Sequence, residues 1–370
     1  MGNSKTNDWY SLKRIKQVEA TYNVIFGERS NGKTYSTLQE GIKRWIDSEG
    51  KDEMGIIRRW QEDIKGKRAS NMFSGINANN EVYKLSNGAY EGVTYFSGKF
   101  YMCNYDEDGK AIYNDKDVLG HTFALTDVEH NKSISYPNIT MIVFDEFLTK
   151  YTYLQDEFVT FMNTISTIVR KRTDVKIYML GNTVNRYAPY FKEMGLTHIS
   201  EMKQGDIDVY KYGESGLTVA VEYCKTYESD TDDDNNFYFA FNNPKLEMIT
   251  SGAWELDIYP HNPTKYKPKE VLMNYFIEFE DNLFHAEVVS TDDQTFTYIH
   301  EKTTDIKEPD TDLIYSLEYS VKPNHNRNIL KPRNDVQKRI LWYYKHDLVF
   351  YQNNEVGDTI NNYLNICKGV

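Results

Sequence analysis

Short runs of consecutive apolar residues recur along the first half of the chain, and each run ends in polar or glycine residues. The clearest runs lie at residues 22–26, 56–57, 139–144 and 175–180. Such runs are typical of strands that are buried on both faces of a parallel sheet. Apolar residues three or four positions apart predict helices over residues 35–46 and 156–170. The pattern therefore predicts an α/β domain with a mainly parallel sheet.

Weaker patterns surround these elements. Residues 81–103 alternate apolar and polar positions around three glycines, which predicts a β-hairpin or meander inserted into the core. Short runs at residues 123–125, 209–212 and 217–222 predict further strands. In the helix over residues 156–170, the side chains that we expect to be buried are Phe158, Phe161, Met162, Ile165, Ile168 and Val169.

The pattern changes after residue 225. An acidic, apolar-free run at 229–236 precedes a stretch that is rich in aromatic residues and broken by prolines. Three alternating runs then predict an antiparallel meander, and two amphipathic stretches predict helices at 335–350 and 356–366. We therefore expect a first domain over residues 1–225, a small connecting or lid subdomain over 226–268, and a third domain over 269–370.

The order of three strands followed by helices in the last domain suggests a ribonuclease-H-like α/β fold. Nucleases with this fold need several carboxylates that converge on two metal ions. Glu278, on the first of the three strands, could be one of them. The later acidic residues lie mostly in turn-like runs, so a nuclease fold without nuclease chemistry is favoured.

Composition limits the class of protein. The 370-residue chain has a formal net charge of −12, which argues against coating nucleic acid by bulk charge but leaves room for a local basic pore or patch. Three widely spaced cysteines match neither a disulfide framework nor a metal-binding spacing, which fits a reducing cytoplasm. No apolar run is long enough to cross a membrane, and the N-terminus has no apolar signal-peptide core.

The strongest chemical signal follows the first apolar run. Residues 27–34 have the spacing G-x-x-x-x-G-K-T of a phosphate loop, preceded by a predicted strand and followed by a predicted helix. Glycines let successive backbone N–H groups turn toward a polyphosphate, and the helix dipole adds positive potential. Lys33 should reach the β- and γ-phosphates of ATP, and the Thr34 hydroxyl should ligate Mg²⁺. The predicted nucleotide contacts are Gly27, Glu28, Arg29, Ser30, Asn31, Gly32, Lys33, Thr34 and Tyr35.

The apolar run at 139–144 ends in Asp145 and Glu146, as a Walker B strand does. Asp145 is placed to hold Mg²⁺ beside Thr34, and Glu146 to orient and deprotonate the attacking water. Acidic pairs after strands are common. Combined with a complete phosphate loop upstream, however, this pair predicts a site that hydrolyses ATP.

Two other strand ends carry polar residues. Asn182 follows the strand at 175–180, and it is either a sensor of the γ-phosphate or lytic water or an ordinary turn asparagine. Arg58 and Arg59 follow the second apolar run. The ends of parallel strands face the ligand crevice, so these arginines either contact nucleotide or form a plain surface pair.

Basic clusters supply candidates for charge neutralisation. Lys65, Lys67 and Arg68 are either phosphate contacts to a nucleic acid or a solvated helix face. Arg170 and its two basic neighbours end a predicted helix. They either complement the helix dipole or include an arginine finger, a residue that is often supplied by a neighbouring subunit.

A phosphate loop, a Walker B Asp-Glu pair and a strand-tip Asn, in this order, resemble the additional-strand P-loop ATPases of the FtsK, HerA and terminase type. The chain has no Asn-Lys-x-Asp motif for reading guanine, which argues against a GTPase. The motifs that narrow the resemblance are Phe26 to Thr34, Arg58-Arg59 before an aromatic residue, Lys132 followed by Tyr136-Pro137-Asn138, Ile142 to Phe147, and Val169 to Arg172. Together they resemble the genome-packaging ATPases of small tailed phages whose linear DNA carries a covalent terminal protein.

The resemblance implies an ATP-driven motor that pushes double-stranded DNA into a preformed procapsid. It implies a homo-oligomeric ring of five copies at the capsid portal vertex in the host cytoplasm, with Arg170 and Lys132 acting across the subunit boundary. In some members the inactive nuclease-like domain contacts a structural RNA. The alternatives are a terminase-like enzyme with an active C-terminal nuclease, a non-catalytic nucleotide-binding structural phage protein, and a nucleotide kinase.

Overall fold

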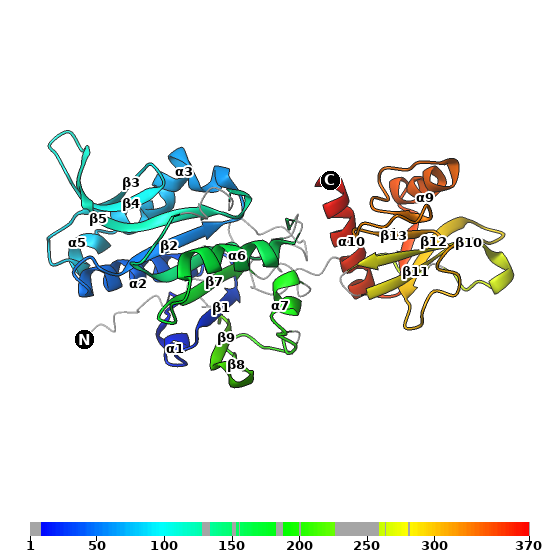
Figure 1. The fold of residues 1–370 in the computed structure, drawn as a ribbon, viewed down its shortest axis with the longest axis horizontal. Helices are drawn as coiled ribbons and strands as arrows, with labels where there is room; N and C mark the ends of the chain where they lie inside the picture. Colours follow the sequence, from blue (N-terminus) through cyan, green and yellow to red (C-terminus); the bar gives the residue numbers. More distant parts are fainter. Residues whose placement is uncertain are drawn as a thin grey trace, which may run out of the picture. The chain divides into compact units, whose positions relative to one another are not determined.

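The computed structural model describes residues 9–127, 134–149, 153–154, 156–182, 188–199, 201–225, 259–262, 264–279 and 282–369. Most of these residues form two compact units, one that ends before residue 226 and one that begins after residue 258 (Figure 1). Of the predicted connecting subdomain, residues 226–258 lie outside the described residues.

The first unit is built on a nine-stranded sheet with the order β3-β4-β5-β2-β6-β7-β1-β9-β8. Its six central strands are parallel: β5 (Ala111–Ala124), β2 (Glu53–Arg58), β6 (Ile139–Asp145), β7 (Lys176–Asn182), β1 (Tyr22–Gly27) and β9 (Leu217–Tyr223). The edge strands are antiparallel: β3 (Gly92–Phe96), β4 (Lys99–Tyr105) and β8 (Ile207–Tyr212). An additional strand, β7, thus lies between the phosphate-loop strand and the Walker B strand, and the predicted mainly parallel sheet is confirmed.

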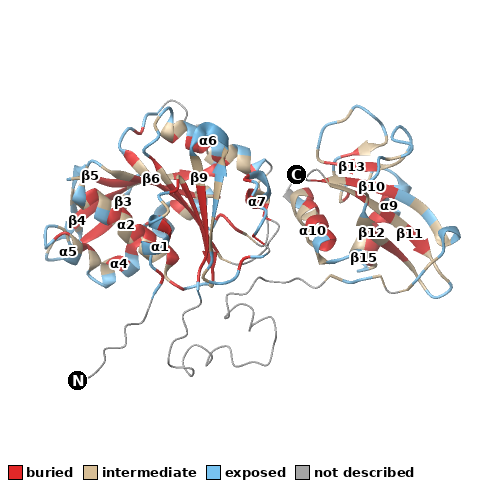
Figure 2. Ribbon diagram, turned by 90° about the horizontal axis from the view of Figure 1, so that it is seen from below, coloured by how far each residue is buried: buried red, intermediate tan, exposed pale blue. Residues whose placement is uncertain are grey.

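Helices cover both faces of this sheet because successive side chains of its strands point to opposite faces. Val143 packs on one face with Ile25 and the segment that contains α1 (Lys13–Lys16), and α2 (Lys33–Asp47) covers the same face farther along. The next residue, Phe144, stacks on Phe161 of α6 (Glu157–Val169) with ring centroids 5.0 Å apart. Figure 2 shows that the buried residues are concentrated along the central strands.

Short helices and loops complete the first unit: η1 (Gln61–Ile64), α3 (Gly66–Ser70), η2 (Asn71–Phe73), α4 (Ser74–Ala78), α5 (Glu81–Leu85), α7 (Pro189–Glu193) and η4 (Gly213–Ser215). The prediction of β structure from residue 81 was wrong at its start, because Glu81–Leu85 is helical and buries Val82 in the core. The short strand predicted at 123–125 is the end of the fourteen-residue strand β5. Met162 was predicted to be buried but is exposed, because α6 turns it away from the aromatic cluster around Phe161.

The second unit contains a six-stranded sheet with the order β14-β13-β10-β11-β12-β15. Its strands are β10 (Val271–Phe279), β11 (Asn282–Ser290), β12 (Thr295–Glu301), β13 (Ile314–Ser316), β14 (His325–Asn326) and β15 (Val349–Tyr351). The first three form the predicted antiparallel meander, and β13 and β14 add beside β10 in parallel. This strand order agrees with the predicted ribonuclease-H-like arrangement.

Helices α9 (Asp335–Lys345) and α10 (Asn354–Gly369) pack against the same face of the second sheet. The Asn334 side chain accepts a hydrogen bond from the backbone N–H of Gln337 and caps the start of α9. The helix predicted over 335–350 is too long: it ends at Lys345, Asp347 takes a positive φ, and β15 then pairs with β12. A short 3-10 turn, η6 (Pro268–Glu270), precedes β10.

Two further features bear on the predictions about disulfide bonds and membrane spans. Cys103, Cys224 and Cys367 are all buried and free, in agreement with the expected lack of a disulfide framework. In the described part of the chain, no helix has both the length and the apolar character that crossing a membrane requires.

Candidate nucleotide site

The phosphate loop joins β1 to α2, and its backbone explains its glycines. Gly32 has φ +94°, a left-handed conformation that a side chain would strain. A Cβ on Gly27 would lie 2.8 Å from the Cβ of Cys224, so this position has no room for a larger residue. The six residues of β1 are all buried, which makes the strand a rigid support for the loop.

Lys33, the first residue of α2, is buried beneath the loop. Its Nζ donates to the carbonyl oxygen of Glu28 at 2.5 Å, to that of Gly27 at 3.3 Å and to Oδ1 of Asn31 at 3.1 Å. Burial lowers the pKa of Lys33, and the nearby Asp145 opposes this effect. Three oxygen atoms of the loop therefore hold the lysine ammonium group in place. Oxygen atoms of a bound phosphate could replace them as hydrogen-bond acceptors.

The other loop residues differ in how far they are buried. Arg29 and Ser30 are exposed, Glu28 is half-buried, and Asn31 is buried with its side chain bonded to Lys33. The Tyr35 side chain packs against the core, and its hydroxyl accepts a hydrogen bond from Asn79. Any contact of Tyr35 with nucleotide would therefore come from its backbone.

The end of β6 meets the start of α2. The Thr34 hydroxyl donates to Oδ1 of Asp145 at 3.0 Å, although the two residues are 111 positions apart. A hydroxyl and a carboxylate are the hard oxygen ligands that Mg²⁺ prefers, so this pair fits a magnesium site. Burial raises the pKa of Asp145, whereas Arg58 lowers it.

Arg58, the last residue of β2, joins the two Walker B acids. Its Nη2 lies 2.8 Å from Oδ2 of Asp145, and its Nη1 lies 2.6 Å from Oε2 of Glu146. The Glu146 side chain is 62% exposed, whereas those of Arg58 and Asp145 are 17% and 7% exposed. The sequence predicted that Arg58 lies at a strand end. It did not predict the ion pairs with Asp145 and Glu146, because these depend on β2 lying next to β6.

Arg59 holds the turn that follows the Walker B strand. Its guanidinium makes a buried, two-pronged ion pair with Glu157, with Nε–Oε2 and Nη2–Oε1 distances of 2.7 and 2.8 Å. It also donates to the carbonyl oxygens of Glu146 and Phe147 at 3.2 and 2.8 Å. Glu146 itself has φ +59°. These bonds fix the backbone of Glu146 in this left-handed turn.

The third strand tip is Asn182, at the end of β7. Its Oδ1 lies 3.5 Å from Nζ of Lys33, and it faces Gly27 in the register between β7 and β1. The structure thus brings the phosphate loop, the Asp145 carboxylate and Asn182 together at the carboxyl ends of the parallel strands. These residues come from β1, β6 and β7, which are neighbours in the sheet but not in the sequence.

The segment before β1 also reaches the carboxyl ends of these strands, which the sequence did not predict. The backbone N–H of Tyr10 donates to the carbonyl oxygen of Asn31 at 3.0 Å, and the Tyr10 hydroxyl donates to buried Glu222 at 2.8 Å. A Cβ placed on Gly32 would lie 3.4 Å from the Trp9 ring, which is largely exposed. Trp9 is therefore an aromatic surface next to the phosphate loop.

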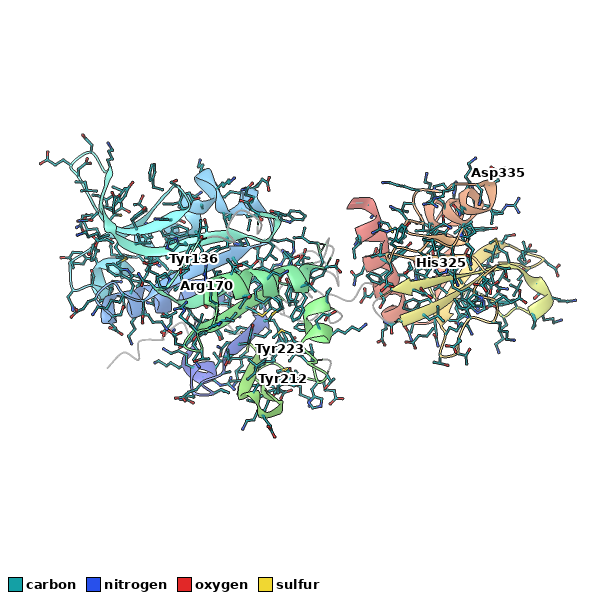
Figure 3. The ribbon with its side chains drawn as sticks, in the orientation of Figure 1. Tyr136, Arg170, Tyr212, Tyr223, His325 and Asp335 are labelled. Atoms are coloured by element: carbon teal, nitrogen blue, oxygen red, sulfur yellow. The ribbon has the colours of Figure 1, made fainter. Side chains whose placement is uncertain are left out.

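The basic residues after α6 lie at the other end of the sheet. Arg170 donates to the carbonyl oxygen of Ile134, and Figure 3 shows it near Tyr136, which precedes β6. Asp145 ends β6, and a seven-residue strand spans about 20 Å. Arg170 is therefore remote from Asp145 of its own chain. Arg172 donates to the carbonyl oxygens of Tyr136, Pro137 and Ile139 and braces this segment.

Lys132 lies outside the described residues. Lys65, Lys67 and Arg68 are exposed on and beside α3, and Arg68 pairs with Asp63 at 2.7 Å. Since these three follow the carboxyl end of β2, they belong to the same end of the sheet as the candidate site.

Comparisons with known proteins found relatives in sequence. The DNA packaging proteins of Bacillus phages phi29 and B103 are 24% and 25% identical to the chain over 186 and 177 residues. These matches cover 50% and 47% of this chain and 49% and 48% of the relatives, so the chain spans about half the length of the curated relatives that it matches.

Two solved structures have a similar fold. The phi-28 gp11 DNA packaging motor has a TM-score of 0.58 at 18% identity, with 98% of this chain and 99% of that chain covered. The bacteriophage phi-29 viral genome packaging motor assembly has a TM-score of 0.57 at 18% identity, with 96% and 99% covered.

A family model described as "Podovirus DNA encapsidation protein (Gp16)" matches residues 5–210, which is more than half of the 370-residue chain. The resemblance to phage packaging proteins that the motifs suggested is thereby confirmed. The protein belongs to the Podovirus DNA encapsidation protein (Gp16) family.

Proposed function

We propose that this protein is an ATP-hydrolysing motor that moves double-stranded DNA into a preformed procapsid. The observation that carries the proposal is the meeting of Lys33, Thr34, Asp145 and Asn182 at one end of the sheet. The family description and the names of the relatives, which are DNA packaging proteins, support the process.

The residues of the site have distinct roles in this proposal. Lys33 and the backbone N–H groups of the loop bind the phosphates of ATP, and Thr34 with Asp145 would hold Mg²⁺. Mg²⁺ would neutralise charge on the β- and γ-phosphates. Glu146, whose carboxylate is largely exposed, orients water and takes its proton, and Asn182 contacts the γ-phosphate or the water.

The direct test measures phosphate release by the full chain with MgATP, in the presence and absence of double-stranded DNA. Turnover that DNA stimulates supports a motor. A chain that binds ATP without any turnover would be the non-catalytic structural protein, and phosphoryl transfer to an added acceptor would indicate a nucleotide kinase.

We expect the change Arg58→Gln to shift the acid limb of the pH profile of kcat/KM for ATP to higher pH. The guanidinium lowers the pKa of Asp145 against the raising effect of burial, so its loss raises that pKa further. Asp145 must be ionised to ligate Mg²⁺, and therefore activity is lost at a higher pH as the solution is acidified. Steady-state rates across the acid range measure the shift, and an unmoved limb would contradict it.

Arg170 is proposed as a residue that acts on the nucleotide of a neighbouring subunit. Its position at the amino end of β6 supports this proposal, because it cannot reach the phosphates of its own chain across the length of the strand. Lys132, which is two positions before Ile134 in the sequence, is proposed for a similar role.

Mixing two inactive variants tests this arrangement. Arg170→Ala subunits keep their own phosphate loop, and Lys33→Ala subunits keep their arginine. In a mixed ring, a Lys33→Ala subunit can supply Arg170 to its neighbour, so we expect mixtures to regain ATPase activity that neither variant has alone. Phosphate release across mixing ratios measures this recovery. Arg172→Ala serves as the comparison, because Arg172 braces its own chain.

The remaining assignments follow the family resemblance. We propose a homo-oligomeric ring of five copies at the portal vertex of the procapsid, in the host cytoplasm, with the structural RNA of some members as a further candidate partner. Exposed Lys65 and Lys67 are proposed contacts to DNA phosphates, which would make DNA binding depend on salt but not on sequence.

An active C-terminal nuclease is less well supported. Glu278 lies on β10, but in the described part of the chain no cluster of three His, Cys, Asp or Glu ligands includes it. Plasmid incubated with the protein and Mn²⁺ should therefore stay uncut.

A further inference from the structure

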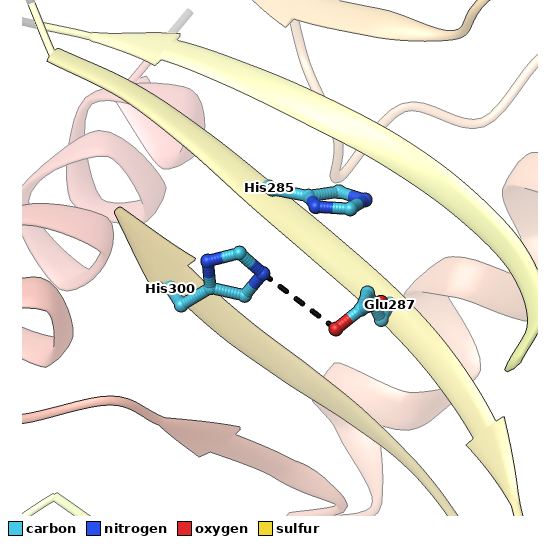
Figure 4. Close-up of side chains that lie close together, drawn as sticks. All are labelled: His285, Glu287 and His300. Atoms are coloured by element: carbon cyan, nitrogen blue, oxygen red, sulfur yellow. Dashed lines mark ion pairs between the residues drawn. The ribbon is translucent and has the colours of Figure 1, made fainter. Parts of the chain in front are cut away.

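The face of the second sheet that α9 and α10 leave open carries a compact group of ligand-type side chains. His285 and Glu287 lie two residues apart on β11, and His300 is the register partner of His285 on β12. Side chains in these positions share one face of a sheet. Figure 4 shows the two imidazoles and the carboxylate together. Their candidate ligand atoms all lie within 4.8 Å of one another.

Each of the three side chains is oriented by a partner outside the group. Nδ1 of His300 lies 2.9 Å from the carbonyl oxygen of Glu301, so it carries the proton and leaves Nε2 free to face Glu287. Nε2 of His285 lies 2.9 Å from Oδ1 of Asn274, which leaves Nδ1 as a possible ligand. The Tyr266 hydroxyl donates to Oε2 of Glu287 at 2.6 Å, and the same oxygen lies 3.6 Å from Nε2 of His300. A carboxylate oxygen has two lone pairs, so Oε2 can accept from Tyr266 and still offer a lone pair to a metal. Metal-binding histidines and carboxylates are usually held by such outer bonds.

The surroundings also favour a bound ion. All three residues are partly buried. Phe276 stacks on His285 with ring centroids 4.9 Å apart, and Tyr298 lies against His300 at 5.6 Å. A simple ion pair between Glu287 and His300, 3.6 Å apart, would explain those two residues alone. It would not explain the second imidazole, that of His285, whose ring centroid lies 4.9 Å from the ring centroid of His300.

The donor set selects the class of metal. Two imidazole nitrogens and one carboxylate suit zinc and related divalent transition metals, whereas magnesium and calcium prefer oxygen ligands alone. Three protein ligands would leave a fourth position of a tetrahedral site open to water or to a ligand from a partner. This group does not include Glu278, and its residues belong to the second unit, whereas those of the nucleotide site belong to the first.

We propose that His285, Glu287 and His300 form a binding site for a zinc-class divalent metal on the face of the C-terminal sheet opposite α9 and α10. The bound metal would join β11 to β12. Through Tyr266, which precedes β10, it would also tie the entry segment of the unit to the sheet.

Metal titration of the full chain tests the proposal. All variants are made in an Asp145→Asn chain and titrated without nucleotide. This weakens cation binding beside the phosphate loop, which would otherwise compete in the titration. Co²⁺ absorption, followed by Zn²⁺ displacement against a chromophoric chelator, should show one site per chain. His300→Gln and His285→Gln should each lose the site or weaken Zn²⁺ binding at least tenfold, and Tyr266→Phe should weaken it about tenfold through the lost outer bond.

His346→Gln is the matched control. His346 lies after α9, is exposed, and already bonds the carbonyl oxygen of Trp342 at 2.7 Å, so its loss should leave Zn²⁺ binding unchanged. Thermal unfolding gives a second readout, because Zn²⁺ should raise the Tm of the parent chain but not that of His300→Gln. Equal Zn²⁺ uptake by the parent and both histidine variants, or no uptake at micromolar Zn²⁺, would overturn the proposal.

Discussion

Replacing Glu146 by Gln should reduce ATP turnover to well below a tenth of the normal rate while ATP binding persists. Glutamine keeps the size of the side chain but cannot accept a proton from water, and general-base catalysis contributes about 10²- to 10⁴-fold. The contacts proposed to bind phosphate come from Lys33 and the loop, which the change does not alter. Phosphate-release kinetics and equilibrium binding of a fluorescent ATP analogue measure the two effects separately.

Glu62→Gln is the matched control for this change. Glu62 is an exposed acid of η1 with no place in the proposed chemistry, so its replacement should leave turnover near normal. If Glu146→Gln also turned over at the normal rate, the proposed role of Glu146 would be refuted. If it lost ATP binding as well, its carboxylate would serve binding and not only catalysis.

Replacing Arg59 by Met should destabilise the first unit by about 3–5 kcal/mol, because it leaves the buried Glu157 carboxylate without its charge partner. The side chains of Arg59 and Glu157 are only 6% and 1% exposed. The change also removes two donors to the turn that holds Glu146. Urea unfolding, followed by a probe within the first unit, measures the loss. Turnover should fall in the folded fraction because the Glu146 backbone is no longer fixed.

Arg68→Met is the surface counterpart. The Arg68–Asp63 ion pair has a similar distance of 2.7 Å, but the Arg68 side chain is 68% exposed. Exposed pairs contribute about 0–1 kcal/mol, so this variant should unfold nearly as the parent does. In a double-mutant cycle, Arg59→Met with Glu157→Gln should cost less than the sum of the single changes. Additive losses, or a small loss for Arg59→Met, would show that the buried pair does not hold the turn.

The candidate nucleotide residues could be proposed from the sequence because the chemistry of a phosphate loop is local. A phosphate loop needs glycines at fixed spacing around a lysine, and the structure gives a left-handed φ at Gly32 and a close approach at Gly27. The position of Asp145 and Glu146 at a strand end was predictable because the apolar run before them is typical of a buried parallel strand, and β6 does end at Asp145. The antiparallel strands of the second unit were predictable from their alternation.

Errors arose where local patterns compete. Glu81–Leu85 forms one helical turn because burying Val82 in the core outweighs the alternating pattern around it. Val349–Tyr351 continues the apolar spacing of α9, and only its pairing with β12 makes it a strand. Propensity is a weak guide for elements this short, because tertiary contacts decide them.

The sequence by itself determined which residues are candidates for phosphate, metal and proton chemistry, because those roles depend on side-chain type and on spacing within one strand and one loop. The tertiary structure decided which of them meet. The placement of β7 between β1 and β6 puts Asn182 beside Lys33, and the placement of β2 beside β6 brings Arg58 to Asp145 and Arg59 to Glu157. Strand order follows from how the helices cover both faces of the sheet, and that packing involves residues more than a hundred positions apart.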